Sequence, residues 1–319
     1  MPAVTVAIPT SRAAYISRAI ESVLGQTFQD FEIVVVNDGA SDTASLERVL
    51  DPFRSRIEYV YQANAGIAAA RNAAVAAAHA PLILNLDDDD WLEPVCIEKQ
   101  VSFMRENPDL DARYANPIYF GETDWSGTCW MDHFPSEGEV SFLSVLEGRT
   151  APANPGAILR RDTVLAAGPY DSWVDSWEDF DMWLRILRGG GRVAYTREAL
   201  VHYRRHGGNV SARGIYHLER GLRVLDKLES STKLTVEEAA QVDRRRGALR
   251  YDLELLRGKE ALARREWVAA REHFEYCVRA KPTAKLRLIE AALRISPGAV
   301  GAGMTWREGI LRWSGRQRH

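Results

Sequence analysis

The stretch LILNLDDDDWLEP, Leu82–Pro94, places four consecutive aspartates, Asp87–Asp90, directly after an apolar run. The apolar run predicts a buried strand, so the aspartates are expected at its carboxyl end. In an extended chain alternate side chains point to the same side, and Asp87 and Asp89 should then converge. Carboxylates this close raise each other's pKa unless a cation neutralises them, and Mg²⁺ is typically held by one or two carboxylates plus substrate phosphates. The alternative is a solvated acidic turn.

Strand-like and helix-like segments alternate around this stretch. Strands are expected over residues 4–9, 31–38, 56–62 and 81–87, and helices over 13–26, 43–53 and 66–78. Repeated strand–helix–strand units predict an α/β fold with a Rossmann-like, mostly parallel sheet flanked by helices. Ligands of such sheets bind at the carboxyl ends of the strands. Polar groups follow three of the expected strands there: Pro9–Thr10, Asn37–Gly39 and Asp87–Asp90.

The composition changes beyond about residue 215. We expect a first domain over residues 1–215 and a C-terminal α-helical extension over 216–319, which is rich in charged residues, alanine and leucine. Residues 255–282 resemble one tetratricopeptide unit, with Gly258, Ala270, Phe274 and Pro282 at suitable spacings. One unit cannot bury its own apolar face, so it is expected to pack on the first domain or on a partner.

Bulk properties exclude several classes of function. The net charge of −3 and pI of about 6.2 leave no global basic field, so we expect no nucleic-acid partner. The 3 cysteines have no CxxC or zinc spacing, and their odd number argues against a disulfide framework. No signal peptide and no apolar run of membrane-spanning length is visible, so a cytoplasmic location is expected.

Other candidate site residues each have a structural alternative. Asp38 lies in NDGASD, which suits either a turn or a base- or ribose-binding site. Arg71, on an alanine-rich helix, is either a surface residue or a phosphate or nucleobase contact. Glu178 and Asp179 open a helix, where acids complement the dipole and where Asp175 or Ser176 could cap. Nearby tryptophans favour a carbohydrate-facing site instead.

One histidine, and the absence of three common motifs, further limit the candidate chemistries of the site. His206 is either a metal ligand or a structural side chain. The sequence contains no GxGxxG, GxxxxGK[ST] or GxSxG, so dinucleotide-binding, P-loop and serine-hydrolase interpretations lack their motifs.

Six segments occur in the order typical of one large family. They are VAIPT, VVVNDGASD, NAGIAAARNAA, LNLDDDDWLEP, WEDFDMWLRI and YRRHGGNVS. Over residues 1–212 the chain resembles glycosyltransferase family 2, the inverting family with the GT-A fold. It differs from many members in its short PTSRAAY, where they carry an aromatic-Asn-Arg sequence after Pro-Thr, and in the fourth aspartate, which leaves the Asp-x-Asp register open by one residue.

The resemblance implies a role for each matching residue. Residues for the nucleotide would be Pro9, Thr10, Asp38, Arg71, Asp87 and Asp88. Asp89 would coordinate Mn²⁺ or Mg²⁺, and His206 would cover the metal or the diphosphate. Asp179 would be the catalytic base, and Glu178 would shape the acceptor side.

The predicted function is metal-dependent, inverting transfer of one sugar from a nucleotide sugar, with a UDP-sugar favoured, to a carbohydrate or lipid-linked acceptor in glycan biosynthesis. The alternative is a non-catalytic nucleotide-sugar-binding scaffold that docks a partner through its helical tail. The basic tail, residues 306–319, leaves open peripheral contact with the inner face of a membrane, and the C-terminal helices leave open a homo-oligomer.

Overall fold

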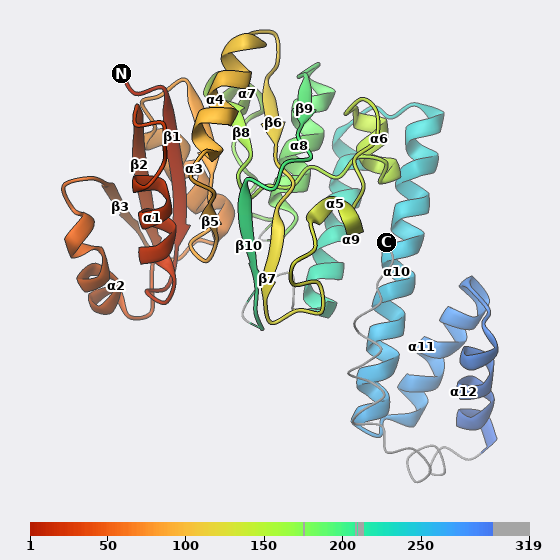
Figure 1. Ribbon diagram of the computed structural model, residues 1–319. Coiled ribbons are helices and arrows are strands. Elements are labelled where there is room, and N and C mark those ends of the chain that lie inside the picture. The colour runs from red at the N-terminus through yellow and green to blue at the C-terminus, as the bar shows by residue number, and fades with distance from the viewer. Residues whose placement is uncertain (175, 208, 210–213, 296–319) are drawn as a thin grey trace. The chain divides into compact units, whose positions relative to one another are not determined.

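The computed structural model describes residues 1–174, 176–207, 209 and 214–295 (Figure 1). The chain forms two compact units, Met1–Gly208 and Asn209–His319. Strands of the first unit are β1 (Val4–Thr10), β2 (Phe31–Asp38), β3 (Glu58–Gln62), β4 (Leu82–Asn85), β5 (Trp91–Leu92), β6 (Ala112–Tyr114), β7 (Ile118–Gly121), β8 (Ile158–Arg160), β9 (Val193–Tyr195) and β10 (Val201–Arg205). Its helices are α1 (Ile16–Leu24), α2 (Thr43–Leu50), α3 (Ile67–Ala77), α4 (Cys96–Glu106), α5 (Trp130–His133), α6 (Phe142–Glu147), α7 (Arg161–Ala167) and α8 (Glu178–Arg188), with a 3₁₀ turn η1 (Asp51–Phe53).

The main sheet has the strand order β3-β2-β1-β4-β8-β6-β9. Strands β3, β2, β1 and β4 run parallel to one another, whereas β8 is antiparallel to both of its neighbours. Thr10 pairs with Asn37, so the carboxyl ends of β1 and β2 are level. The predicted α/β class, with a mostly parallel sheet flanked by helices, is confirmed.

Side-chain alternation along the parallel strands separates two buried layers. Val4, Val6 and Ile8 of β1 join a core with the apolar faces of α1, α2 and α4. Helix α3 packs on β1 and β2 and buries small residues such as Ala70 and Ala74. Small side chains let this helix approach the sheet closely, and they bring its single arginine, Arg71, into the interior.

A second sheet of three strands, β5-β10-β7, follows the aspartate run. Strand β10 pairs antiparallel with β5 and parallel with β7. β5 begins at Trp91, directly after Asp90, and pairs with β10. This pairing keeps β10, and His206 that follows it, close to the aspartates.

The second unit is helical where it is described. It contains α9 (Gly214–Ser231), α10 (Val236–Ala263), α11 (Trp267–Ala280) and α12 (Ala284–Ile295). Gly258 faces Phe274, since a Cβ on Gly258 would lie 3.2 Å from that ring. Phe274 is buried in a core built by α10, α11 and α12. The tetratricopeptide interpretation of residues 255–282 stays a prediction, and the basic tail lies outside the described residues.

Two local features differ from what the sequence patterns suggest. The aromatic and polar segment over residues 114–134 predicts strand and loop, but within it Trp130–His133 forms the short helix α5, whose first turn is closed by a hydrogen bond from the Cys129 backbone N–H to Asp132. For helix α8, a side-chain cap from Asp175 or Ser176 was the structural alternative to a carbohydrate-facing site. Its N-cap is Trp177, with φ +74° and no capping side chain, and Asp175 lies outside the described residues. None of the helices in the described ranges is long and apolar enough to cross a membrane.

Candidate active site

The four aspartates form a turn rather than an extended segment. The Asp90 N–H donates to the Asp87 carbonyl over 3.1 Å, which closes the turn. The expectation that Asp87 and Asp89 share one side of an extended strand is therefore wrong, because β4 ends at Asn85 and aspartate favours turns. The four carboxylates instead have partners on three other segments: Arg71 pairs with Asp87, Arg12 pairs with both Asp88 and Asp89, and the Arg204 N–H donates to Asp90.

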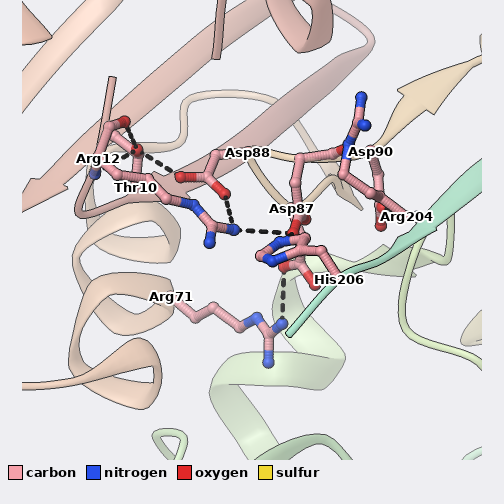
Figure 2. A network of polar contacts seen from close by, with 9 residues as sticks. Thr10, Arg12, Arg71, Asp87, Asp88, Asp90, Arg204 and His206 are labelled. Carbon is pink, nitrogen blue, oxygen red and sulfur yellow. Dashed lines mark hydrogen bonds and ion pairs between the residues drawn. The ribbon is translucent and has the colours of Figure 1, made fainter. Parts of the chain in front are cut away.

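Asp88 and Asp89 both form ion pairs with one arginine from the loop after β1. Arg12 Nη2 lies 3.0 Å from Asp88 Oδ1 and 2.7 Å from Asp89 Oδ2 (Figure 2). The Thr10 hydroxyl donates to Asp88 Oδ2 over 2.7 Å. Burial raises the pKa of Asp88 to about 6, although Arg12 opposes the shift. The carboxyl ends of β1 and β4 are thus linked through charge-assisted contacts.

Arg71 connects the aspartate turn to helix α8. Its Nη2 lies 3.0 Å from Asp87 Oδ1, and its Nη1 forms an ion pair with Glu178. Arg71 and Glu178 are both buried, at 4% and 6% exposure. Burial by itself lowers the pKa of Arg71, but Glu178 and Asp87 raise it overall, so the guanidinium stays charged. The surface alternative for Arg71 is excluded by its burial.

Helix α8 presents two acids at its first positions. Trp177 takes a left-handed conformation just before the helix, which turns the chain sharply into Glu178. Asp179 is half-buried, and its Oδ1 accepts the Phe180 N–H over 2.7 Å. Burial raises the pKa of both Glu178 and Asp179, whereas Arg71 opposes the rise. These carboxyls hold their protons to higher pH than exposed acids do.

Strand β10 brings a histidine to the same aspartates. His206 Nε2 lies 2.9 Å from Asp89 Oδ2. Arg204 donates its backbone N–H to Asp90 Oδ1 and its Nε–H to the Asp89 carbonyl. The Arg204 guanidinium lies 4.3 Å from the Tyr15 ring centroid and 4.5 Å from that of Phe120, contacts that hold the β10 end over the turn.

Asp38 lies at the end of β2 and organises the approach to α3. Its carboxylate accepts hydrogen bonds from the side chain of Gln62 and from the backbone N–H groups of Ala65 and Gly66. Gly39, with φ +62°, leaves no room for a Cβ, which would lie 2.4 Å from the Asn64 nitrogen. Asp38 therefore fixes the loop that leads into the helix of Arg71.

The predicted residues thus divide into two groups. A connected network contains Thr10, Arg71, Asp87, Asp88, Asp89, Glu178 and His206, with Asp179 adjacent to Glu178 on α8. Pro9 and Asp38 lie on the neighbouring ends of β1 and β2, where Asp38 contacts the loop before α3.

Comparisons with known proteins identify the family. The model of Glycosyl transferase family 2 matches residues 5–155. A relative from Escherichia coli, the UDP-Glc:alpha-D-GlcNAc-diphosphoundecaprenol beta-1,3-glucosyltransferase WfaP, is 30% identical over 211 residues, which cover 66% of this chain and 79% of WfaP. The chain belongs to glycosyltransferase family 2.

A second relative of this family 2 chain matches over a similar length. The putative glycosyltransferase EpsH of Bacillus subtilis is 27% identical over 215 residues, covering 64% of the chain and 61% of EpsH. The chain thus spans less than two thirds of the length of EpsH.

Solved structures show the same fold. A structure of TarS from S. aureus in complex with UDP-GlcNAc has a TM-score of 0.60 at 16% identity, covering 92% of the chain and 91% of the TarS chain. The mannosyltransferase PcManGT from Pyrobaculum calidifontis, in complex with GDP-Man and Mn²⁺, has a TM-score of 0.58 at 15% identity, covering 98% of this chain and 84% of PcManGT. The expected GT-A fold is confirmed.

The residues present fit a hard divalent cation. A carboxylate oxygen of Asp89 and the imidazole Nε2 of His206, which lie 2.9 Å apart, are ligand types that Mn²⁺ and Mg²⁺ accept in proteins. Asp90 Oδ2 is buried and has no hydrogen-bond partner within the described part of the chain. A buried, incompletely satisfied carboxyl beside two acidic neighbours marks a place where added positive charge is stabilised.

Sequence reasoning missed two residues of this site. Arg12 follows the Pro-Thr pair by two positions, and Arg204 precedes His206 by two positions in YRRHGG. The one sequence signal that could have pointed to these two arginines was the excess of acidic residues in the motifs. An acidic cluster in a folded interior needs cations, and Arg204 lies inside the YRRHGGNVS motif, whereas Arg12 lies just after VAIPT, in the segment that departs from the family pattern.

Proposed function

We propose that this family 2 chain is an inverting, metal-dependent glycosyltransferase that moves one sugar from a nucleotide sugar to an acceptor hydroxyl. The observation that carries this proposal is the convergence of two acidic motifs: Asp87–Asp90 and Glu178–Asp179 are joined by buried Arg71 at one end of the sheet. Arg71 and Glu178, 107 residues apart in the chain, thereby belong to one charged site. Donor and acceptor chemistry can take place on its two sides.

The nucleotide is proposed to lie at the carboxyl ends of β1 and β2. Thr10, Asp38 and Pro9 line these ends, and ligands of parallel α/β sheets bind there. We favour UDP because TarS was solved with UDP and with UDP-GlcNAc, and because WfaP is named for UDP-Glc. Asp87 and Asp88 would face the ribose and diphosphate.

Mn²⁺ or Mg²⁺ is proposed to be held by Asp89 with His206. When bound, the cation supplies charge stabilisation for the diphosphate that leaves. Arg71 stays charged and holds Asp87 in place, so the donor meets a preorganised set of charges. Because the surrounding groups are already oriented, little reorganisation is needed when negative charge develops.

Asp179 is proposed as the base. As the acceptor oxygen attacks the anomeric carbon, that oxygen's proton moves to an Asp179 oxygen while the bond from the anomeric carbon to the diphosphate breaks on the opposite face. Inversion follows from this single displacement. Burial raises the pKa of Asp179, and a pKa nearer to neutrality makes a carboxylate a better proton acceptor. Glu178, occupied by Arg71, would shape the acceptor side.

The acceptor is proposed to be a growing glycan or a lipid-linked sugar. WfaP is named for a diphosphoundecaprenol-linked acceptor, and ExoU of Rhizobium meliloti, 28% identical over 258 residues, is named for succinoglycan biosynthesis. Trp173, at 55% exposure in the segment that precedes α8, offers a ring on which a sugar could stack. A lipid-linked acceptor would place the protein peripherally at a cytoplasmic membrane face.

Transfer from a panel of UDP-, GDP- and dTDP-sugars with Mn²⁺ tests this function. A thermal-shift screen first identifies the nucleotide, because a ligand that binds the folded state raises the unfolding midpoint. Transfer that depends on Mn²⁺ and disappears in Asp179→Asn is expected, and inversion is read from the anomeric configuration of the product. Transfer that survives both EDTA and Asp179→Asn would reject the metal and base assignments.

The scaffold alternative is tested by calorimetry together with the transfer assay. Calorimetry that detects UDP binding by the wild-type chain, without turnover on any acceptor and with co-purification of a partner, would favour it.

A further inference from the structure

The unexpected feature of the site is the position of Arg12. Its Nη2 atom lies within hydrogen-bond distance of both Asp88 and Asp89. The Asp89 oxygen that it contacts, Oδ2, also lies 2.9 Å from His206 Nε2. Arg12 therefore uses an oxygen of the same carboxylate that is proposed to hold the metal.

A guanidinium and a divalent cation cannot easily share this carboxylate edge. Each needs lone pairs of Asp89 and Asp88, and two cations at ligand distance from the same oxygens repel each other. Asp89 is 5% exposed, so water does not screen the repulsion effectively. Binding of one cation must therefore weaken binding of the other.

Arg12 is placed to move. It belongs to the loop between β1 and α1, outside both elements, and its side chain is 35% exposed. Arg71, by contrast, is 5% exposed and is held by acids from two directions. A guanidinium fork also matches the oxygens of a phosphate with two hydrogen bonds, so a diphosphate offers Arg12 a partner of equal quality.

We propose that Arg12 competes with the divalent cation for Asp88 and Asp89, and that it changes partner to the diphosphate when a nucleotide sugar binds. This inference rests on the proposed function and adds a binding order to it. The cation alone meets a site whose carboxylates are occupied by Arg12. The nucleotide removes that competitor and brings its own phosphate ligands, so cation and nucleotide bind together.

Titration of the full chain with Mn²⁺, followed by electron paramagnetic resonance of the free ion, tests the inference without relying on activity. Arg12→Gln is expected to bind Mn²⁺ in the absence of nucleotide about tenfold more tightly than the wild type, because a charge-assisted contact is removed. The increase in Mn²⁺ affinity caused by UDP should be about tenfold smaller in Arg12→Gln, since binding free energies are coupled reciprocally.

Arg18→Gln is the matched control. It removes one positive charge from the adjacent helix α1, but its guanidinium lies over Trp91, 3.1 Å from the ring centroid. It should bind Mn²⁺ as the wild type does. Circular dichroism checks that both variants are folded, and Arg12→Lys, which keeps the charge but loses the fork, should fall between the wild type and Arg12→Gln.

The outcomes of the Mn²⁺ titrations distinguish a failure of the inference about Arg12 from a failure of the proposed function. Equal Mn²⁺ affinity in the wild type and Arg12→Gln, with binding abolished by Asp89→Asn, overturns the role of Arg12 and leaves the metal site intact. Equal gains in Arg12→Gln and Arg18→Gln also overturn it, because a general charge effect then explains the result. Absence of Mn²⁺ binding by every variant, with or without UDP, overturns both the inference and the metal-dependent function.

Discussion

The two ends of the main sheet both gather carboxylates and a histidine, but the protein uses them differently. At the amino ends of β2 and β3, Glu32, Glu58 and His79 bring ligand atoms within 4.8 Å of one another. Glu32 accepts the backbone N–H groups of His79 and Ala80 over 2.7 and 3.1 Å. Glu58 and His79 are exposed, at 43% and 64% for their side chains.

At the carboxyl ends, Asp88 and Asp89 are buried and both form ion pairs with the side chain of Arg12. A carboxylate that accepts backbone N–H groups stabilises the fold, because those donors would otherwise remain unsatisfied. A buried carboxylate held by a partly exposed arginine can exchange that partner for a ligand. The comparison teaches that proximity of acids does not by itself define a candidate site, because Glu32 is held by backbone N–H groups whereas Asp88 and Asp89 pair with a side chain that can move.

The largest effect is expected at the proposed base, Asp179. Asp179→Asn should lower kcat about 10²–10⁴-fold with Mn²⁺ present, because proton abstraction from the acceptor is lost. Glu58→Gln, at the opposite end of the sheet, should leave kcat unchanged. Initial rates of nucleoside diphosphate release provide the measurement. Equal losses in the two variants would remove the distinction between the two ends.

Metal removal is expected to have the next largest effect. EDTA should lower kcat/KM about 10²-fold, because several kcal/mol of charge stabilisation for the leaving diphosphate is lost. Added Mn²⁺ should restore the rate. Asp89→Asn should abolish the restoration, whereas His79→Ala should retain it. Restoration in Asp89→Asn combined with its loss in His79→Ala would place the functional metal at the amino ends instead.

The pH dependence of the reaction should report the pKa of Asp179. Asp179 accepts a proton only when it is ionised, and burial raises its pKa. Activity is therefore present above the raised pKa and should fall about tenfold per pH unit below it. The kcat/KM profile at saturating Mn²⁺ measures this limb. A limb at the ordinary pKa of an exposed aspartate would show that another group limits the reaction.

The smallest effect is expected at the amino ends and concerns stability. Glu32→Ala leaves the N–H groups of His79 and Ala80 without their acceptor, which should cost about 1–3 kcal/mol. The unfolding midpoint should then fall by about 2–4 °C per kcal/mol, as expected for a domain of this size. Glu58→Gln should change stability by about 0.5 kcal/mol or less. UDP affinity measured by calorimetry should be unchanged in both variants. A loss of UDP affinity would show that the amino ends of the sheet influence nucleotide binding at the carboxyl ends.

Much of the fold was predictable because its signals are local. The apolar run of β2, Phe31–Asp38, and the alanine-rich α3 have patterns that depend only on neighbours in the chain. The family motifs likewise located Thr10, Asp87–Asp90 and Glu178 without a structure. Backbone detail was less predictable: Trp177 in the left-handed region is a rare conformation that no local propensity favours.

The sequence by itself determined the alternation of strands and helices, the family, and which acids lie at the strand ends, because these depend on local composition and spacing. Only the tertiary structure decided that Asp87–Asp90 is a turn, that Arg71 joins it to Glu178, and that Arg12 holds Asp88 and Asp89. Ion pairs between residues 76 to 107 positions apart form only after the strands are ordered in the sheet. Their identity is a property of the folded chain.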